Sequence, residues 1–351
     1  MSSLLFYHFS STIKTNSHRV SQFGVYLSIA FDTEVFNLRA QPTIQSVIEK
    51  VNNWGRWGPD DELGTLNYIT PDKRVQAGQL VRRGVTFSLS LPLDRFGLQP
   101  PMDRRLNPQH IMLTSGSDLL AGTQPRHKGG FGYADDMIIM ALQAATHWNA
   151  LSHIFYDYHM YNNRHCSLVS AEGAAKNSIA VASALIVSRA VLLDFPRTLS
   201  VPWLSEDHYI TVEEIEHTLS RQGVGIEPGD ILLFRTGHMA RFLASGEWNE
   251  YTYTNEPGPG LEVLLWLHEH QIAAVASDTS SFEAVPSRTP LWLPIHAVGI
   301  VYMGLMLGEN FLLDEWANDC AADGVYEAFI CAAPIPFSRA VGAPVNPLVA
   351  K

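Results

Sequence analysis

Two histidines and an amide lie close together in the segment QAATHWNALSH, residues 143–153. Asn149 is two positions after His147, and His153 is six positions after it. Residues i and i+2 of a strand face the same side, so His147 and Asn149 can point at one ligand. Imidazole nitrogens and an oxygen donor at this spacing are typical of a divalent-metal site. Paired histidines are also found as hydrogen-bonded core residues, so the spacing alone leaves both interpretations open.

A second pair of candidates, His296 and Glu309, lies thirteen positions apart in PIHAVGIVYMGLMLGEN. An imidazole and a carboxylate in an apolar segment cost free energy unless each finds a partner. A metal ion would satisfy both, and so would a carbonyl beside His296 and an ion pair or helix cap for Glu309. The apolar run DDMIIMALQ before His147 predicts a buried strand that leads the turn to the floor of a pocket.

Other motifs predict no chemistry. GGFGYADD and GVGIEPG do not lie between a strand and a helix, and the chain has no GxxxxGK[ST] motif, which argues against nucleotide binding. His165 and Cys166 are adjacent, and adjacent side chains rarely reach the same substrate atom. Ser115 and Ser117 lack the flanking glycines of a nucleophile elbow.

Composition restricts the class of protein. With 46% hydrophobic and 17% charged residues, the 351-residue chain can bury a large core. A net charge of -11 and the lack of any Lys/Arg-rich run argue against nucleic acid as a partner. The apolar stretches are too short to span a bilayer. Cys166, Cys320 and Cys331 have no CxxC spacing and there is no Asn-x-Ser/Thr sequon, so we expect a reducing, cytoplasmic location.

No linker divides the chain, so we expect a single domain over residues 44–351. Residues 1–43 predict a disordered or targeting-like extension. Its first thirty residues are Ser-rich and contain Lys14 and Arg19 but no acidic residue, and the first acidic residue is Asp32. A mitochondrial presequence is therefore the alternative to a cytoplasmic location.

Turn and capping residues predict an alternation of strands and helices. Thr70 and Pro71 begin a helix that reaches about residue 83, and Thr211 caps a helix in ITVEEIEHTLSRQG. Two further segments, SIAVASALIVSRAV and PGLEVLLWLHEHQ, have helical length. The expected strands are VTFSLSL, HIMLTSGS, AVLLDF, GDILLFRTG and AAVASD. This order indicates an α/β fold with a sheet covered by helices.

From about Trp54 to the carboxyl end, the chain resembles the putative cyclase family, which includes bacterial-type kynurenine formamidase and isatin hydrolase. The segments that carry the resemblance are RWGPDDELGTLN, LNPQHIMLTSGSD, QAATHWNALSHIFYD, GDILLFRTG, WLHEHQIAAVASDT, LPIHAVGIVYMGLMLGEN and DGVYEAFICAAPIP. The resemblance implies the swivelling β/β/α fold, a partly open mixed β-barrel surrounded by helices. It also implies a homodimer or larger homo-oligomer.

The family motif H-x-G-T-H-x-D-x-P-x-H is only partly present. Thr146, His147 and His153 match it, whereas Gln143 replaces the first histidine and Asn149 replaces the aspartate. The resemblance places two further metal ligands at His296 and Glu309. Because a neutral amide cannot neutralise two cations, the expectation is one divalent metal ion, zinc or manganese. The expected ligands are His147, His296, Glu309 and Asn149.

The resemblance implies a metal-dependent hydrolase of an amide, lactam or lactone carbonyl. Arylformamidase-like activity on N-formylkynurenine-type substrates would place it in tryptophan catabolism, cleaving carbon–nitrogen bonds other than peptide bonds. His147 and His153 are the expected catalytic residues, with His153 as the proton shuttle. The expected partner is an aromatic or cyclic small molecule. The residues expected to bind it are Asn149, Gln143, His110, Trp148, Tyr156 and Asp278.

Two alternatives follow from the lost aspartate. The first is a non-hydrolytic cyclase, dehydratase or isomerase of a specialised metabolite, which uses His147 and His153 as acid and base without a tightly bound metal. The aromatic residues Trp148, Phe155, Tyr156 and Tyr161 near these histidines suit such a ligand, although aromatic side chains near a core turn also serve packing. The second alternative is an inactive binding relative, which would hold no metal and turn over no carbonyl substrate.

Overall fold

A computed structural model describes residues 42–98, 105–124, 129–248, 251–252 and 254–351. Residues 41–351 form one compact unit. The expected extension, residues 1–43, lies outside the described residues except for its last two, and the domain boundary at residue 44 stays a prediction. The first described helix, α1 (Ile44–Val51), begins after Thr43, whose side chain accepts a hydrogen bond from the Ser46 amide.

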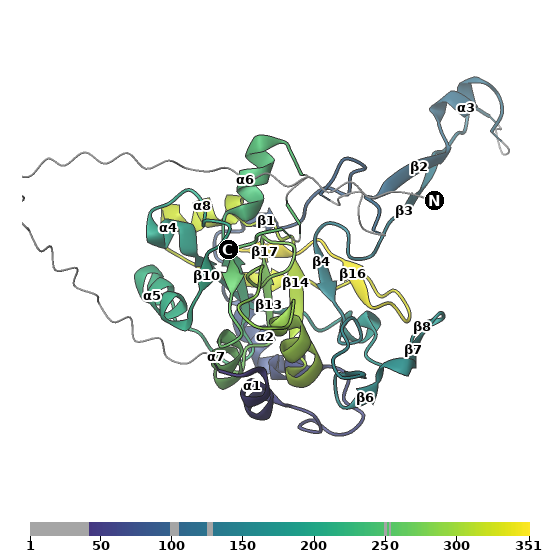
Figure 1. Ribbon diagram of the computed structural model, residues 1–351. Coiled ribbons are helices and arrows are strands. Elements are labelled where there is room, and N and C mark those ends of the chain that lie inside the picture. Colours follow the sequence, from purple (N-terminus) through teal and green to yellow (C-terminus); the bar gives the residue numbers. More distant parts are fainter. Residues whose placement is uncertain (1–41, 99–104, 125–128, 249–250, 253) are drawn as a thin grey trace, which may run out of the picture. The chain divides into compact units, whose positions relative to one another are not determined.

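A curled nine-stranded sheet, half of a barrel, forms the centre of this unit and is surrounded by helices (Figure 1). The four strands β9, β11, β13 and β14 run parallel, and the remaining neighbours pair antiparallel. This confirms the expected α/β fold with a mixed, partly open barrel. The strand order is β1 (Thr86–Ser88), β17 (Leu348–Ala350), β15 (Glu327–Cys331), β9 (Val187–Asp194), β11 (Ile231–Arg235), β13 (Ala274–Ser277), β14 (Met306–Glu309), β4 (His147–Asn149) and β16 (Gly342–Pro344).

Both faces of the sheet are buried, because successive residues of each strand point to opposite sides. In β9, Val191 and Leu193 enter one core and Ala190 and Leu192 the other. The first core is closed by α1, by α7 (Val263–Glu269) and by the π-helix η4 (His296–Met303). The second is closed in part by α8 (Asp314–Asp323). Buried on both faces, these strands are nearly continuous hydrophobic runs.

Shorter elements complete the unit. The helices are η1 (Gly64–Tyr68), α2 (Pro71–Gly78), α3 (Gly116–Leu120), η2 (Cys166–Leu168), η3 (Ile179–Ala182), α4 (Phe195–Leu199), α5 (Val212–Gln222) and α6 (His238–Ser245). Four strand pairs lie outside the main sheet: β2 (Gln109–Thr114) with β3 (Asp135–Ile139), β5 (His159–Met160) with β6 (Arg164–His165), β7 (Val169–Ser170) with β8 (Gly173–Ala174), and β10 (Tyr209–Ile210) with β12 (Gly258–Pro259).

The capping residues in the sequence correctly predicted where two of the helices begin. Thr70 accepts a hydrogen bond from the Lys73 amide and Pro71 is the first residue of α2, although this helix ends at Gly78 rather than near residue 83. Thr211 and Glu214 form a capping box at the start of α5. A side-chain acceptor that satisfies a free amide in the first turn is a local signal, which is why sequence alone can find it.

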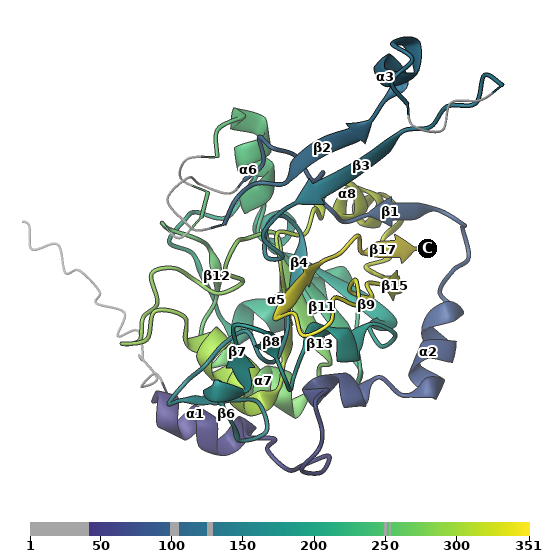
Figure 2. The same ribbon diagram turned by 90° about the vertical axis from the view of Figure 1, so that its right-hand side faces the viewer.

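Two expectations about elements are wrong. The segment SIAVASALIVSRAV is not a helix: it is the short η3 followed by β9, which is paired on both sides by β11 and β15. The run DDMIIMALQ is not a buried strand, because all five residues of β3 are exposed. β3 and β2 form a ribbon with α3 at its tip, and this ribbon extends away from the sheet and its helices (Figure 2).

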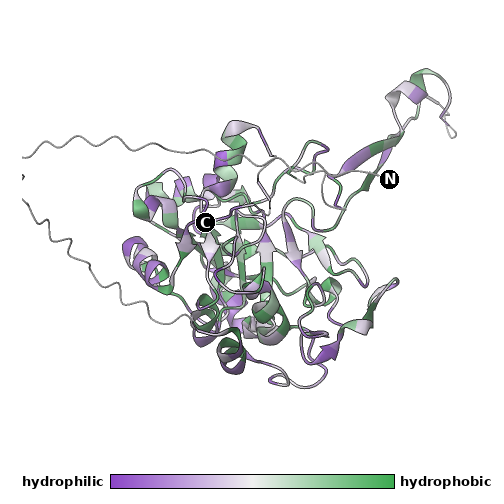
Figure 3. Ribbon diagram, in the orientation of Figure 1, coloured by the Kyte–Doolittle hydropathy of each residue, from purple (hydrophilic) through white to green (hydrophobic). Residues whose placement is uncertain are grey.

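Hydropathy differs between the central sheet and the outer sides of the helices. Figure 3 shows the central strands largely hydrophobic and the exposed sides of helices such as α5 hydrophilic. Among the described residues, none of the helices has the length and apolar character needed to cross a membrane.

Candidate functional site

Strand β4 contains both His147 and Asn149, as their spacing predicts, and lies between β14 and β16. In the antiparallel pair with β14, His147 is directly opposite Glu309. Directly opposite residues project from the same face of a sheet, so the two side chains meet. His147 Nε2 lies 3.1 Å from Glu309 Oε2, and Asn149 Nδ2 donates to Glu309 Oε1 at 3.2 Å. All three residues are buried.

His296, the first residue of η4, lies between two carboxylates. Its Nε2 is 2.8 Å from Glu309 Oε1 and its Nδ1 is 2.7 Å from Glu283 Oε1. Glu283 also accepts the backbone N–H groups of Ile295 at 2.7 Å and of His296 at 2.8 Å. Sequence reasoning missed Glu283. The available signal was a lone acidic residue in SSFEAVP, thirteen positions before His296, the same separation that links His296 to Glu309.

The charges of this cluster stabilise one another. Burial alone lowers the pKa of His296, but hydrogen bonds to Glu283 and Glu309 outweigh burial and raise it to about 10. Burial raises the pKa of Glu309, and the close polar contacts with His147 and His296 overcome this and hold that pKa well below its usual range. Burial raises the pKa of Glu283, partly opposed by His296. His296 is therefore an imidazolium at neutral pH.

A second set of hydrogen bonds fixes the ring of His147. Its Nδ1 lies 2.9 Å from the carbonyl oxygen of Ala145, which also accepts from Asn310 Nδ2 at 3.2 Å. Tyr251 donates its hydroxyl to Asn310 Oδ1 at 2.9 Å, and Thr146 donates its hydroxyl to the Asn310 carbonyl at 2.5 Å. Ala145 and Asn310 both have positive φ, 58° and 60°. Sequence reasoning did not identify Asn310 or Tyr251.

Several buried polar atoms near His147 have no hydrogen bond within the described part of the chain: His147 Nε2, whose contact with Glu309 lacks good geometry, Asn149 Oδ1, Gln143 Nε2, Ser152 Oγ and His153 Nδ1. Such atoms are costly unless water or a ligand binds them. Gln143 lies near β4, since a Cβ placed on Gly342 would be 2.6 Å from its Nε2, and Gly342 is paired with Asn149.

His153 faces the same cluster. Burial lowers the pKa of His153 to about 3, opposed in part by the charge of Glu309 and reinforced by that of His296. Its imidazole is therefore neutral across the physiological range and acts as a hydrogen-bond partner there rather than as a cation.

The donor set does not fit a metal ion. In the described ranges there is no group of three or more His, Cys, Asp or Glu residues that could hold one. Both ring nitrogens of His296 already face carboxylate oxygens, so no lone pair of this ring is free to bind a cation. Gln143 and Asn149 bring no negative charge. A bound zinc or manganese ion is therefore expected only from the resemblance, and the contacts in the structure do not support such an ion.

Three residues that were expected to bind substrate lie away from the cluster, whereas Asp278 adjoins it through the Tyr251 hydroxyl, which lies 3.2 Å from the Asp278 carbonyl oxygen. Trp148 points to the other face of β4, where it is fully buried and donates to the Ala332 carbonyl. His110 lies on the exposed ribbon and pairs with Asp136 at 2.8 Å. The Asp278 carboxylate accepts from the Thr236 amide and hydroxyl and from the Gly237 amide, and burial raises its pKa to about 6. Tyr156 packs on the ring of Tyr302.

The other two aromatic candidates are also outside the cluster. Tyr161 is fully buried and its hydroxyl donates to Asp61 at 2.8 Å, so it serves packing. Phe155 is 44% exposed. Of the residues predicted from sequence, the structure thus brings together His147, Asn149, His296 and Glu309, with Gln143 and His153 beside them.

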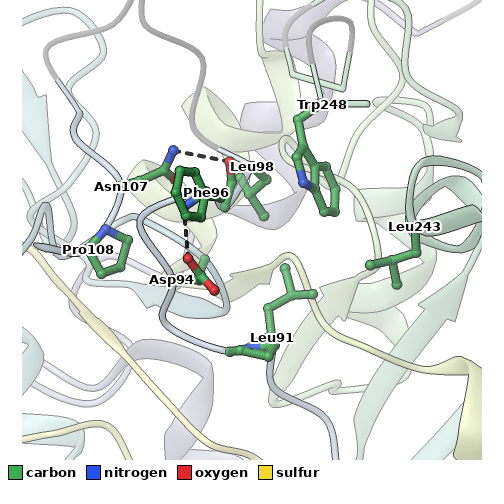
Figure 4. A pocket seen from close by; sticks show the side chains of 11 residues that line it. Leu91, Asp94, Phe96, Leu98, Asn107, Pro108, Leu243 and Trp248 are labelled. Atoms are coloured by element: carbon green, nitrogen blue, oxygen red, sulfur yellow. Dashed lines mark hydrogen bonds between the residues drawn. The ribbon is translucent and has the colours of Figure 1, made fainter. Parts of the chain in front are cut away.

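An apolar cavity of about 180 Å³ lies beside the site (Figure 4). Trp248 and Leu243 are on one side of it and Leu98 and Phe96 on the other, with Ala145 in its wall. A second cavity of about 360 Å³ is bordered by Pro344, which pairs with His147 across β16 and β4. Neither of these two cavities is lined by the histidines themselves, although Ala145 and Pro344 connect them to the strand that carries His147.

Solved structures share this fold. Isatin hydrolase A from Labrenzia aggregata, bound to benzyl benzoate, is 19% identical with a TM-score of 0.56, covering 78% of this chain and 94% of its own. Isatin hydrolase A from Ralstonia solanacearum is 19% identical with a TM-score of 0.57, covering 80% and 98%. At these identities the likeness concerns the fold.

A third solved structure, described as a novel cyclase, is more similar. It is 36% identical with a TM-score of 0.79 and covers 86% of this chain and 100% of its own. A search of curated proteins found no match. Residues 47–284, more than half of the chain, match the family described as Putative cyclase. The resemblance seen in the sequence is thus confirmed, and the chain belongs to the cyclase family.

Proposed function

We propose that the chain is a hydrolase that opens the carbonyl–nitrogen or carbonyl–oxygen bond of a small amide, lactam or lactone by acid–base chemistry. One observation carries this proposal: Glu309 lies between the imidazoles of His147 and His296, with His153 beside them, in a buried site. Hydrolysis of such a bond needs a base that takes a proton from water and an acid that returns it to the leaving atom. The cluster contains groups for both steps.

The proton taken from water would be transferred to His147, beside Glu309. Both ring nitrogens of His147 face oxygen acceptors, yet a neutral imidazole can donate from only one of them. Because Nδ1 faces a carbonyl, it carries the hydrogen of the neutral ring, and Nε2 can accept a proton beside the Glu309 carboxylate. The imidazolium of His296, anchored by Glu283, keeps Glu309 ionised and in place. A proton taken from water can therefore rest on His147 and later pass to the leaving nitrogen or oxygen.

The free polar atoms would bind the substrate. Gln143 Nε2 is a buried donor without a partner in the described chain and can bind the carbonyl oxygen, where negative charge develops in the transition state. His153 and Asn149 offer acceptors that can orient the attacking water. In this proposal His147 takes the proton-shuttle role that was expected of His153, and the neutral ring of His153 holds the attacking water by a hydrogen bond.

The cavity would receive the remainder of the substrate. Its apolar wall and its volume of about 180 Å³ suit one ring, since a cavity of about 150 Å³ holds benzene. An aryl formamide such as N-formylkynurenine, a substrate of tryptophan catabolism, or a cyclic amide such as isatin has its amide nitrogen attached to such a ring. We therefore keep arylformamidase-like activity as the first specificity to test.

The test combines metal content with turnover. Full-length protein purified without a tag is assayed on N-formylkynurenine, isatin and simple lactones, with and without a chelator, beside Glu309→Gln and His147→Ala. We expect hydrolysis that survives chelation, metal well below one ion per chain, and a loss of kcat of about 100-fold or more in both variants. Stoichiometric metal that is lost in His147→Ala, together with chelator-sensitive turnover, would contradict the acid–base proposal and restore the metal-dependent one.

A second candidate, a non-hydrolytic cyclase, dehydratase or isomerase, is favoured by the same cluster. Without a group of three ligands in the described chain, the site resembles one that moves protons on a substrate. Solvent deuterium entering the carbon skeleton of a carbonyl compound, without uptake of water across the bond, would identify this chemistry. An inactive binding relative would show neither reaction, although a substrate analogue would still bind.

A further inference from the structure

Tyr251 is fully buried and lies between the apolar cavity and the candidate site. Its ring packs edge-on against that of Trp248, with ring centroids 5.3 Å apart, and Trp248 lines the cavity (Figure 4). The backbone joins the same two residues, because the Tyr251 amide donates to the Trp248 carbonyl at 3.1 Å. A change at the cavity wall is therefore felt directly by Tyr251, which the proposed hydrolysis does not itself use.

The hydroxyl of Tyr251 begins a chain of hydrogen bonds that ends at His147. It donates to Asn310 Oδ1 at 2.9 Å, and Asn310 Nδ2 donates to the Ala145 carbonyl at 3.2 Å. The same carbonyl lies 2.9 Å from His147 Nδ1. An amide offers an acceptor on one side and donors on the other. With its oxygen bound by the hydroxyl, the Asn310 amide thus keeps its nitrogen turned towards Ala145.

Ala145 is the residue at which these hydrogen bonds meet the cavity wall. It lines the cavity and packs in one small apolar core with Tyr251 and Leu91, which also lines it. Its φ of 58° is in the left-handed region, and a residue with a Cβ keeps this conformation only where its surroundings hold it. The hydrogen bond from Asn310 is one such restraint. Loss of this restraint would free the carbonyl that orients His147.

We propose that Tyr251 is a positioning residue, through which a ring bound in the cavity improves the orientation of the His147 imidazole. The inference deepens the proposed function and rests on it for the chemistry. A ring in the cavity would confine Trp248 and, through it, the Tyr251 hydroxyl on Asn310. Binding energy from a part of the substrate that does not react would then raise kcat rather than lower KM. The substrates that gain are amides whose nitrogen carries an aromatic ring.

The first test needs no turnover. Full-length protein is titrated with benzene as the probe, and NMR follows the ring nitrogens of His147 and Trp248, assigned by their absence in His147→Gln and Trp248→Phe. In the wild type, benzene should shift both signals with one midpoint concentration. In Tyr251→Phe, which removes only the hydroxyl, benzene should still shift the Trp248 signal and leave the His147 signal in place.

Tyr161→Phe is the matched control. Both tyrosines are fully buried and each donates its hydroxyl to an oxygen atom, but Tyr161 donates to Asp61, outside the cluster. This variant should respond to benzene as the wild type does. The proposal is overturned by a His147 signal that still responds in Tyr251→Phe, or that stays in place in the wild type. A Trp248 signal that benzene leaves unchanged, or an equal loss of response in both variants, overturns it too.

The second test measures turnover of two formamides. Formanilide carries a ring on its amide nitrogen and N-methylformamide does not. In Tyr251→Phe the ratio of kcat for formanilide to kcat for N-methylformamide should fall roughly tenfold, as for residues of a coupled network, with KM for formanilide changed less than about threefold. Trp248 is partly exposed, so Trp248→Leu is compatible with folding and should lower the same ratio.

Two outcomes of the kinetics are decisive. An unchanged ratio in both variants, or a loss that appears only in KM, would overturn the positioning role. If the wild type hydrolyses neither compound, the proposed hydrolysis fails, and the benzene titration still decides whether Tyr251 connects the cavity to His147.

Discussion

His296 is the residue on which the electrostatics of the site depend. Two buried carboxylates would repel each other and lose their hydration, and the imidazolium between them offsets both costs. Removing one member of such a buried set leaves an unpaired charge, which costs more than the pair contributes when intact. Glu283, His296 and Glu309 therefore act as one unit, and a single substitution should affect all three.

This unit predicts a pH dependence of stability. The pKa of His296 is raised to about 10 in the folded protein, against 6.5 for the ordinary imidazole. The stabilisation is thus complete below pH 6.5 and is lost as the pH rises towards 10. We expect the free energy of unfolding of the wild type to fall between pH 7 and 9, by at most about 1.4 kcal/mol per pH unit.

The measurement is urea unfolding at a series of pH values, compared with two variants. His296→Gln should remove most of the slope between pH 7 and 9. His238→Gln is the control, because burial lowers the pKa of His238 to about 4 and this ring stays neutral throughout the range. Equal slopes in the wild type and in His296→Gln would show that His296 is not protonated in the folded state.

At the scale of elements, β4 and β14 bring the site together, and Gly308 allows them to do so. It is paired with Trp148 in the register. A Cβ on Gly308 would lie 2.7 Å from Trp148 Cζ3 and 2.8 Å from Phe311 Cε2, too close for any real contact. We expect Gly308→Ala to destabilise the protein by about 1–3 kcal/mol through overpacking and to reduce activity, because β4 would shift.

Thermal and urea unfolding test this prediction, with Gly78→Ala in α2 as the control. A Cβ at Gly78 would meet nothing within 4 Å, and alanine favours the helix by roughly 0.5–1 kcal/mol. Gly78→Ala should therefore be neutral or stabilising. A Gly308→Ala variant as stable as the wild type would mean that Trp148 can move without cost.

Helix α5 offers a more local prediction. Thr211 accepts from the Glu214 amide and Glu214 accepts from the Thr211 amide, closing the first turn. Thr211→Ala should lower the free energy of unfolding by about 1 kcal/mol, whereas Thr211→Ser, which keeps the acceptor, should cost much less. Denaturant unfolding of the two variants side by side decides this, and equal losses would argue against the capping role.

The difference between local interactions and contacts between distant segments explains which features the sequence could predict and which it could not. Caps such as Thr70 and Thr211 act within one turn, so residue types alone identify them. The segment SIAVASALIVSRAV has helical length, but it forms the short η3 and the start of β9, whereas AVLLDF, the second part of β9, is a strand as expected. β3 is apolar like a core strand, but it is exposed on the ribbon, and no local pattern distinguishes a core from a surface of that kind.

For the site, spacing placed His147 and Asn149 on one strand because strand geometry is regular. Glu283 could not be placed, since its contact with His296 joins a segment without regular structure to the first residue of η4, thirteen positions later. Trp148 was expected to bind substrate because it lies between two site residues. Side chains alternate along a strand, however, so Trp148 projects from the opposite face of β4. Asp278 is polar and buried, and its carboxylate accepts hydrogen bonds from the Thr236 and Gly237 amides, so its role towards a substrate stays a prediction.

At the scale of the whole unit, the edge strands of the sheet must be held in place as firmly as the central strands. At one end, β1, β17 and α8 meet at Lys351, whose side chain is only 3% exposed. Its Nζ lies 2.8 Å from Asp323 Oδ1 and 2.9 Å from Asp319 Oδ2, and it donates to the Val325 carbonyl at 2.9 Å. One buried ammonium thus links the last strand to the helix that covers one face of the sheet.

We expect Lys351→Met, which keeps the apolar stem and removes the charge, to cost about 2 kcal/mol, as for hydrogen bonds to a charged group. Lys176→Met is the matched control, because Lys176 is 42% exposed and, within the described part of the chain, forms an ion pair with Glu62 alone. Exposed pairs contribute about 0.2–1 kcal/mol and weaken with salt. Urea unfolding at low and high salt should show a large, salt-insensitive loss for Lys351→Met and a small, salt-sensitive one for Lys176→Met. Equal losses would mean that burial of the ammonium adds nothing to closing this end of the sheet.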